Sequence, residues 1–253
     1  MDAKNPARRI ALLTSLLMVC GAAQAQLGTT WTLASDYDFR GTSNSATDPV
    51  LQASLDYETP KGFWIGAWAS NFDYGPGYDG DLELDLYAGY THELSETRSW
   101  SAGLTAYTFP DSHGSIENGP IGVQSSFEGY VDVTLDGFHA AQWYTPDYAK
   151  LGASALYTEA NYLWTLPRAF SLRAHAGIAW GDYWDREDLG AGTLGDFALA
   201  LSCAVGQFTL AGTITGTDAS GARRVTHGAF TNQARFVLSV ETTFPWDRTS
   251  PGN

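Results

Sequence analysis

Short segments in which apolar and polar side chains alternate recur along almost the whole chain. In the first of them, Trp31 to Arg40, the odd positions are aromatic or aliphatic except for Ser35, and the even positions include two aspartates. A period of two places successive side chains on opposite faces of a β-strand. About 9–11 tilted residues cross a bilayer as a strand, and this segment has ten. The pattern predicts an all-β fold, an antiparallel transmembrane β-barrel.

The same pattern predicts about twelve strands, or ten if the weakest segment, Phe138 to Tyr144, is not a strand. The segments are Trp31–Arg40, Val50–Glu58, Phe63–Ser70, Asp81–Thr91, Ser99–Phe109, Phe127–Leu135, Phe138–Tyr144, Ser154–Trp164, Phe170–Trp180, Asp196–Val205, Phe208–Gly216 and Gln233–Phe244. The segment from Phe63 has two apolar faces, and neither can be assigned to the outside. Long and short connections alternate, which is typical of outer-membrane barrels with short periplasmic turns and long extracellular loops. Whether the longest loop, Pro110 to Ser126, folds inward is left open.

The first 25 residues have the features of a cleaved signal peptide. Three basic residues precede an apolar segment, Ile10 to Val19, and Ala23-Gln24-Ala25 forms a small-x-small cleavage site. The apolar segment is too short to span a membrane as a helix. We therefore expect residues 1–25 to be removed and residues 26–253 to form one barrel domain.

The chain is acidic, with 28 Asp and Glu against 14 Lys and Arg and a net charge of −14. Nucleic-acid phosphates require a basic face, so nucleic acid is excluded as a partner. Aromatic residues make up 13% of the chain, which interfacial girdles of a barrel would explain, as would the filled core of a β-sandwich. Cys203 is the one cysteine after the leader, so it has no partner for an internal disulfide.

Four blocks of sequence resemble a TorF-type family of proteobacterial outer-membrane porins. They are Leu33–Gly41, Asp48–Gln52, Gly62–Asn71 and Leu82–Tyr90, and Tyr144–Tyr148 is a weaker match. The resemblance implies an outer-membrane barrel with channel activity, without a defined substrate and without catalytic residues. Many barrels end on an aromatic residue that the assembly machinery reads. Here nine residues follow Phe244, so we expect an internal assembly signal.

In a pore, the polar faces of the strands line the lumen. The expected pore-lining residues are Asp36, Asp38, Arg40, Asp56, Glu58, Glu83, Asp85, Glu128, Asp132, Glu159, Arg173, His175, Arg235 and Glu241. Ten acids against three arginines favour cations in a narrow channel. Alternatively, the charges pair across strands and plug the barrel. The three arginines form either a ladder that faces acids or an anion-binding row, with Arg40 and Arg235 on the strands that close the barrel.

These features predict a channel for passive diffusion of small hydrophilic solutes or ions, with a mild preference for cations. No catalytic residue, metal site or cofactor is expected, because the five histidines show no metal-binding spacing. The expected partners are outer-membrane lipid, small solutes or ions, and the barrel-assembly machinery; the oligomeric state is open. Two alternatives remain: a lipid-acting barrel enzyme that uses His175 with a serine, and a structural or adhesive barrel.

Overall fold

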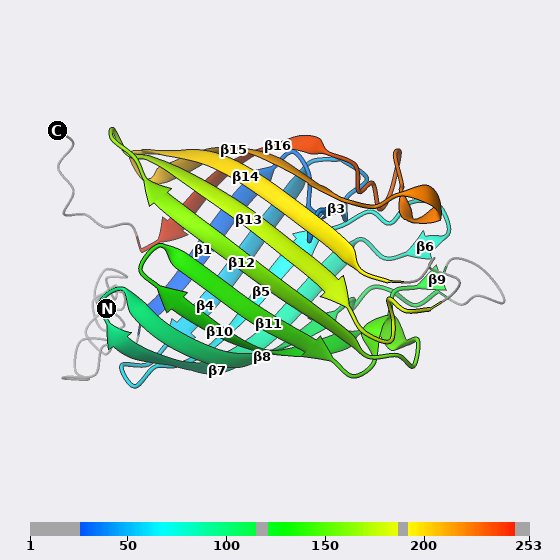
Figure 1. Cartoon of the computed structure of the whole chain (residues 1–253), viewed down its shortest axis with the longest axis horizontal. Coiled ribbons are helices and arrows are strands. Elements are labelled where there is room, and N and C mark those ends of the chain that lie inside the picture. The colour runs from blue at the N-terminus through cyan, green and yellow to red at the C-terminus, as the bar shows by residue number, and fades with distance from the viewer. Residues whose placement is uncertain (1–25, 115–120, 187–191, 246–253) are drawn as a thin grey trace, which may run out of the picture.

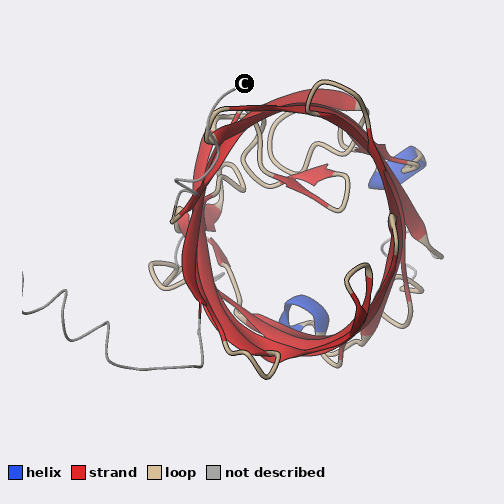
Figure 2. Cartoon of the chain, turned by 90° about the vertical axis from the view of Figure 1, so that its left-hand side faces the viewer, coloured by secondary structure: helices blue, strands red, loops and turns tan. Residues whose placement is uncertain are grey.

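The computed structural model describes residues 26–114, 121–186 and 192–245. Within them, twelve antiparallel strands form one closed barrel (Figure 1; Figure 2). The strands are β1 (Gln26–Ala34), β4 (Val50–Glu58), β5 (Phe63–Asn71), β7 (Leu82–Ser95), β8 (Arg98–Thr108), β10 (Ser126–Leu135), β11 (Phe138–Thr145), β12 (Ala155–Thr165), β13 (Phe170–Trp180), β14 (Leu194–Val205), β15 (Phe208–Thr217) and β16 (Arg235–Phe244). Each pairs with its neighbours along the chain, and β1 pairs with β16, so the wall has no free edge. The predicted twelve-strand barrel is confirmed, and the weak segment from Phe138 is a true strand.

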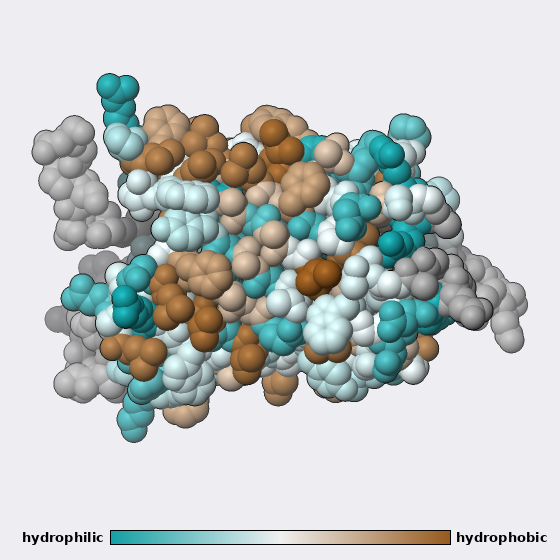
Figure 3. All heavy atoms as spheres, viewed as in Figure 1, coloured by the Kyte–Doolittle hydropathy of each residue, from teal (hydrophilic) through white to brown (hydrophobic). Residues whose placement is uncertain are grey.

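The outward face of the wall is apolar, as the alternation predicts. Leu104 on β8 and Phe236 on β16 are each 62% exposed. Apolar side chains cover much of the wall in Figure 3. On β5, Phe63 and Ile65 point outward and Trp64 points inward, which settles the face that the sequence left open. Exposed apolar area of this extent is typical of a lipid-facing barrel surface.

Short and long connections lie at opposite ends of the barrel (Figure 1). The turn end carries residues 59–62, 96–97, 136–137, 166–169 and 206–207. The long-loop end carries residues 35–49, 72–81, 109–114, 121–125, 146–154, 181–186, 192–193 and 218–234. There, β6 (Tyr78–Asp79) pairs in parallel with β9 (Ile121–Gly122). The described part of this end also contains the 3-10 turns η1 (Tyr148–Lys150) and η3 (Gly221–Arg223). Among the described residues, no helix has the length and apolar character needed to cross a membrane.

The predicted first strand, Trp31 to Arg40, is wrong in its second half. β1 ends at Ala34, and residues 35–49, here called the inner loop, fold into the barrel. In this loop β2 (Asp38–Phe39) pairs with β3 (Thr42–Ser43), and Arg40 and Gly41 make the turn with φ of 49° and 76°. The alternation therefore continues in a small hairpin inside the barrel and not in the wall. The predicted signal peptide, residues 1–25, lies outside the described residues.

Candidate functional site

Arg235 fastens the inner loop to one wall of the barrel. It is the first residue of β16, and its Nε donates a hydrogen bond to Asp36 Oδ2 at 2.5 Å. Its Nη1 donates to the carbonyl oxygen of Gly41 at 2.7 Å, and its Nη2 pairs with Asp38. The planar guanidinium presents these donors in a fixed fork. One side chain thus satisfies two carboxylates and a carbonyl of the loop.

Hydroxyl groups of the loop itself complete this anchor. The Ser43 hydroxyl donates to Asp36 Oδ1 at 2.5 Å, and the Ser45 hydroxyl donates to the same oxygen at 3.0 Å. All three residues are buried. A buried carboxylate is costly unless it is paired and hydrogen-bonded. Asp36 meets both conditions, so this carboxylate can be buried inside the barrel.

Arg40, at the turn of the inner hairpin, reaches a different wall. Its Nη2 and Nη1 bind the two carboxylate oxygens of Glu128 on β10, at 2.6 and 3.1 Å. The Tyr107 hydroxyl donates to the same carboxylate at 3.0 Å, and the Arg40 guanidinium lies 4.1 Å from the Tyr157 ring centroid. Two-point arginine–carboxylate pairs are among the strongest charge-assisted hydrogen bonds.

The two arginines hold the inner loop across the full width of the barrel. β10 lies six places from β16 in the ring of twelve strands, so Arg235 and Glu128 belong to opposite walls. Figure 2 looks along the barrel and shows chain segments inside the ring of strands. The inner loop therefore narrows the lumen near the long-loop end.

One side of the lumen beside the inner loop is filled by apolar side chains. Tyr37 of the loop packs with Val50, Phe72 and Val237, and its ring centroid lies 5.5 Å from that of Trp68. Under this packing, Glu83 and Asp85 on β7 are only 3% and 7% exposed. These two acids face the interior as expected, but they are enclosed and do not reach the open lumen.

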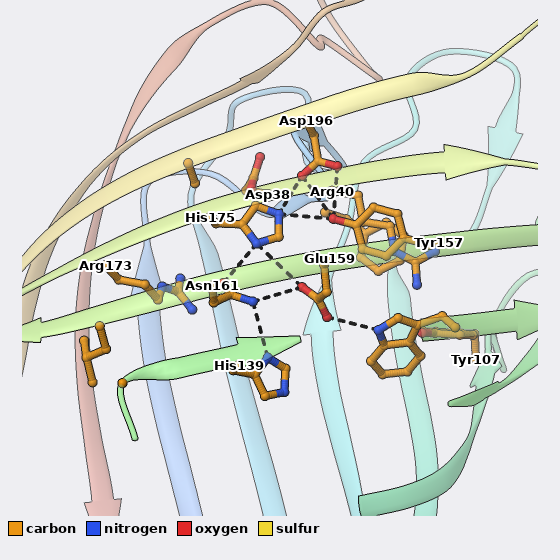
Figure 4. A pocket seen from close by; sticks show the side chains of 15 residues that line it. Asp38, Arg40, Tyr107, His139, Tyr157, Glu159, Asn161, Arg173, His175 and Asp196 are labelled. Atoms are coloured by element: carbon orange, nitrogen blue, oxygen red, sulfur yellow. Dashed lines mark hydrogen bonds and ion pairs between the residues drawn. The ribbon is translucent and has the colours of Figure 1, made fainter. Parts of the chain in front are cut away.

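The other side of the lumen stays open. A cavity of about 540 Å³ lies between the inner loop and strands β11 to β14. Its lining is polar and charged at many positions, including Asp38, Arg40, Glu159, Arg173, His175 and Asp196. Figure 4 shows these side chains pointing into the same space.

A continuous hydrogen-bond network crosses the wall of this cavity. His175 Nε2 lies 2.7 Å from Asp196 Oδ1, and the Tyr157 hydroxyl donates to Asp196 at 3.0 Å. On its other side, His175 Nδ1 lies 2.9 Å from Asn161 Oδ1 and 3.6 Å from Glu159. The Trp143 indole donates to Glu159 at 3.0 Å. The network fixes the polar side chains against the wall and leaves the cavity clear.

Arg173 differs from the other two arginines. It lies on β13, lines the open cavity, and is exposed to it. Within the described residues it has no ion pair, whereas Arg40 and Arg235 both pair with acids. The expected placement of Arg40 on a closing strand is wrong, because Arg40 belongs to the inner loop. Arg40 and Arg235 do face acids, as in the ladder alternative.

A second cavity, of about 350 Å³, lies against β4, β5, β7, β8, β10 and β11. It is lined by the aromatic side chains of Trp64, Tyr87, Tyr130 and Trp143. Trp143 also lines the first cavity, so the two spaces meet at this residue.

The expected pore-lining residues fall into two groups. Those on strands whose side chains face the interior are Asp56, Glu58, Glu83, Asp85, Glu128, Asp132, Glu159, Arg173, His175, Arg235 and Glu241. The remaining three, Asp36, Asp38 and Arg40, lie inside the barrel on the inner loop. Their assignment to the first strand is wrong, but their interior location follows from the anchor on Arg235 and Glu128.

Several residues of the cavities were not singled out from the sequence. They are Tyr107, His139, Trp143, Tyr157, Asn161 and Asp196. The signal for Tyr157 and Asn161 was available, since both share the face of Glu159 on the same predicted strand. Asp196 lies on the polar face of its strand in the same way. For Tyr107, His139 and Trp143, the sequence does not show which aromatic or uncharged polar side chains face inward.

The geometry around His175 bears on the enzyme alternative. Its described partners are Tyr157, Asn161, Glu159 and Asp196, and none of them is a serine. A Ser–His mechanism requires the serine hydroxyl within hydrogen-bond reach of the imidazole. Nothing in this arrangement supplies that nucleophile, and both ring nitrogens already have partners.

Comparison with known proteins adds a family and a fold. A family model described as "Bacterial protein of unknown function (Gcw_chp)" matches residues 20–244. None of the curated proteins compared with the chain matches it. Among solved structures, the chain is similar to the NanC porin, with a TM-score of 0.54, 10% identity, and coverage of 86% of this chain and 98% of that one. It is also similar to the KdgM porin, with a TM-score of 0.50, 9% identity and the same coverage. At this identity the likeness concerns the fold, a porin-like twelve-strand barrel.

Proposed function

We propose that this chain, which belongs to the bacterial family of unknown function Gcw_chp, forms an outer-membrane channel for passive diffusion of small hydrophilic solutes or ions. The observation that carries the proposal is the open polar cavity beside the inner loop. Hydrophilic solutes cross a barrel only where polar groups replace part of their hydration. The inner loop narrows this path and leaves the side of β11 to β14 free.

Barrels with porin names share this architecture, and the apolar outer wall suits a lipid environment. Outer-membrane lipid and the barrel-assembly machinery are the partners that such a location requires. In this orientation the long-loop end faces the outside of the cell and the turn end faces the periplasm, as in other bacterial barrels.

We further propose a mild preference for cations. Among the described residues, eight of the interior acids named above have no arginine or lysine partner. Glu83 and Asp85 are enclosed under the packing of Tyr37. The other six are Asp56, Glu58, Asp132, Glu159, Asp196 and Glu241. Of the three interior arginines, only Arg173 has no ion pair among the described residues. A lumen with an excess of one charge raises the local concentration of counter-ions and so favours their passage.

Conductance of the refolded mature protein in a planar bilayer under a KCl gradient tests both proposals. Steady openings with a cation-selective reversal potential would support the channel and its preference. Openings with an anion-selective potential would reject the preference alone. A folded barrel that stays silent at all salt concentrations would reject the channel, and lipid hydrolysis and surface binding would then be assayed.

A further inference from the structure

Four aromatic side chains form a shelf on the inner wall, here called the aromatic shelf: Tyr87 on β7, Trp64 on β5, Tyr130 on β10 and Trp143 on β11. Trp64, Tyr130 and Trp143 belong to one cross-strand row. In that row Trp64 pairs with Gly89, Gly89 with Gly103, Gly103 with Tyr130, and Tyr130 with Trp143. The row thus contains two adjacent glycines between bulky rings.

The glycines let the rings lie against the wall. A Cβ added to Gly103 would lie 2.6 Å from Trp64 and 2.8 Å from Tyr130, so both rings cover the backbone of this residue. Trp64 also covers Gly89, and Tyr87 covers Gly66 in the neighbouring row. The Trp64 and Tyr130 rings are inclined by only 20°, with centroids 6.3 Å apart. The Trp143 ring packs face to face on that of Tyr130, with centroids 4.3 Å apart and an inclination of 31°.

Carboxylates border the shelf. Glu58 pairs in register with Trp64, and Asp56 pairs with Gly66 and accepts a hydrogen bond from the Tyr87 hydroxyl. Both acids line the same 350 Å³ cavity, together with Thr105. Glu58 has no ion pair within the described part of the chain. The cavity therefore offers aromatic ring surface on one side and hydrogen-bond acceptors at its edge.

We infer that the aromatic shelf binds uncharged, hydroxyl-rich ring solutes, of which pyranose sugars are the typical class. The faces of aromatic rings carry partial negative charge, which attracts the polarised C–H bonds on the face of a sugar ring. The carboxylates of Asp56 and Glu58 accept hydrogen bonds from sugar hydroxyls. A cavity of this size falls in the range of ligand pockets, about 300–1,000 Å³.

The same acids disfavour anionic sugars. A uronic acid carboxylate next to Asp56 and Glu58 would add like charges in a confined space, which raises its energy. The guanidinium of Arg40 lies 5.7 Å from the Trp143 ring centroid, but it is already paired with Glu128. The inference rests on the proposed channel function only for access of the solute to the lumen, since binding itself does not require conduction.

The test compares a neutral and an anionic oligosaccharide of equal length, maltotetraose and tetragalacturonate. Isothermal titration calorimetry on the refolded barrel in detergent measures binding, and single-channel recording measures interruptions of the current. We expect maltotetraose to bind and to interrupt the current, and tetragalacturonate to do neither at the same concentration.

Variants assign the effect to the aromatic shelf. Trp64→Ala should weaken maltotetraose binding at least about fivefold, and Trp64→Phe should retain most of it because a ring remains. Tyr130→Ala is a second variant in case the first does not fold. Trp100→Ala is the matched control, because Trp100 lies on the outward face of β8. Its binding should equal that of the unaltered protein.

The possible outcomes distinguish a failure of the sugar-binding inference from a failure of the channel proposal. Sugar binding by a silent barrel would reject the channel and keep the inference. A conducting barrel that does not bind maltotetraose, or that prefers tetragalacturonate, would overturn the inference and keep the channel. Equal losses in Trp64→Ala and Trp100→Ala would also overturn it, because the shelf would then not be the site.

Discussion

Arg40 and Glu128 form a two-point ion pair inside the barrel, with nitrogen–oxygen distances of 2.6 and 3.1 Å. The two residues are separated by 88 positions in the chain. The pair fixes the turn of the inner loop to the wall opposite Arg235, so the loop is held at both sides of the lumen. Loss of either the Arg40–Glu128 pair or the Arg235 contacts should change both the width of the lumen and the stability of the barrel.

Arg40→Ala should widen the channel and weaken the fold. The substitution leaves Glu128 buried without its cation, and breaking a buried ion pair in this way costs about 3–5 kcal/mol. Released from β10, the turn of the inner loop no longer crosses the lumen. We therefore expect a higher single-channel conductance and a lower free energy of unfolding, measured by denaturant titration in detergent.

Two further variants control for this effect. Arg98→Ala removes an ion pair with Asp136 whose side chains are 56% and 62% exposed, and such surface pairs contribute about 0–1 kcal/mol. Its conductance should stay unchanged. The double variant Arg40→Ala/Glu128→Gln should recover part of the lost stability, because no buried charge remains, while its conductance stays high. An unaltered conductance in Arg40→Ala would show that the inner loop is not the constriction.

Arg235→Lys should loosen the inner loop although it keeps the charge. A lysine ammonium is a compact cation and does not reproduce the planar fork that binds Asp36, Asp38 and the Gly41 carbonyl together. We expect fluctuating conductance levels and faster proteolysis within residues 35–49 than in the unaltered protein. Steady current and unchanged cleavage would mean that the remaining contacts, chiefly the apolar packing of Tyr37, hold the loop alone.

Ion selectivity should move in opposite directions on neutralising an acid and a base of the open cavity. Glu159→Gln removes a negative charge and should shift the reversal potential toward anions, whereas Arg173→Gln should shift it toward cations. Both shifts should shrink at 1 M KCl, where the Debye length is about 3 Å. Shifts of the same sign in both variants, or none at low salt, would contradict control of selectivity by the lumen charges.

Strand positions were predictable from the sequence because the barrel wall has a different environment on each side. Phe170–Trp180 shows the reason, since lipid-facing apolar residues alternate with Arg173 and His175. The inner loop escaped prediction because its alternation continues that of β1 in phase, interrupted only by Ser35. Tyr37 and Phe39 occupy apolar positions in phase with Trp31 and Leu33, and Gly41 alone marks the turn.

The aromatic shelf could not be predicted from the sequence, for a different reason. Trp64, Gly103 and Tyr130 meet because four strands pair in a particular register. The alternation of one strand fixes which face each side chain takes, but a shift of two residues leaves that alternation unchanged, so it does not by itself fix which residues of neighbouring strands pair. Alternation predicts that Tyr130 faces inward, but not that a tryptophan from β5 lies beside it. Sites built across several strands therefore require the three-dimensional structure.

The packing of the inner loop against the barrel wall can be tested by comparing two glycines with similar backbone conformations, one in this loop and one elsewhere. Gly41 has φ of 76°, and a Cβ there would lie 2.6 Å from the Gly216 carbonyl oxygen and 2.8 Å from Asp196 Cβ. Gly152 has φ of 73° and nothing within 4 Å of an added Cβ. Both Gly→Ala changes incur a left-handed backbone penalty of about 1–2 kcal/mol.

Gly41→Ala should cost more than this penalty, because overpacking adds about 1–3 kcal/mol. Denaturant titration should therefore give a clearly lower free energy of unfolding for Gly41→Ala than for Gly152→Ala. Gly152→Ala is the matched control, because it has the backbone strain without the steric clash. Gly41→Ala should also raise the conductance, since the added methyl group displaces the loop from β14 and β15. Equal stabilities for the two variants would mean that the inner loop does not pack against the wall at Gly41.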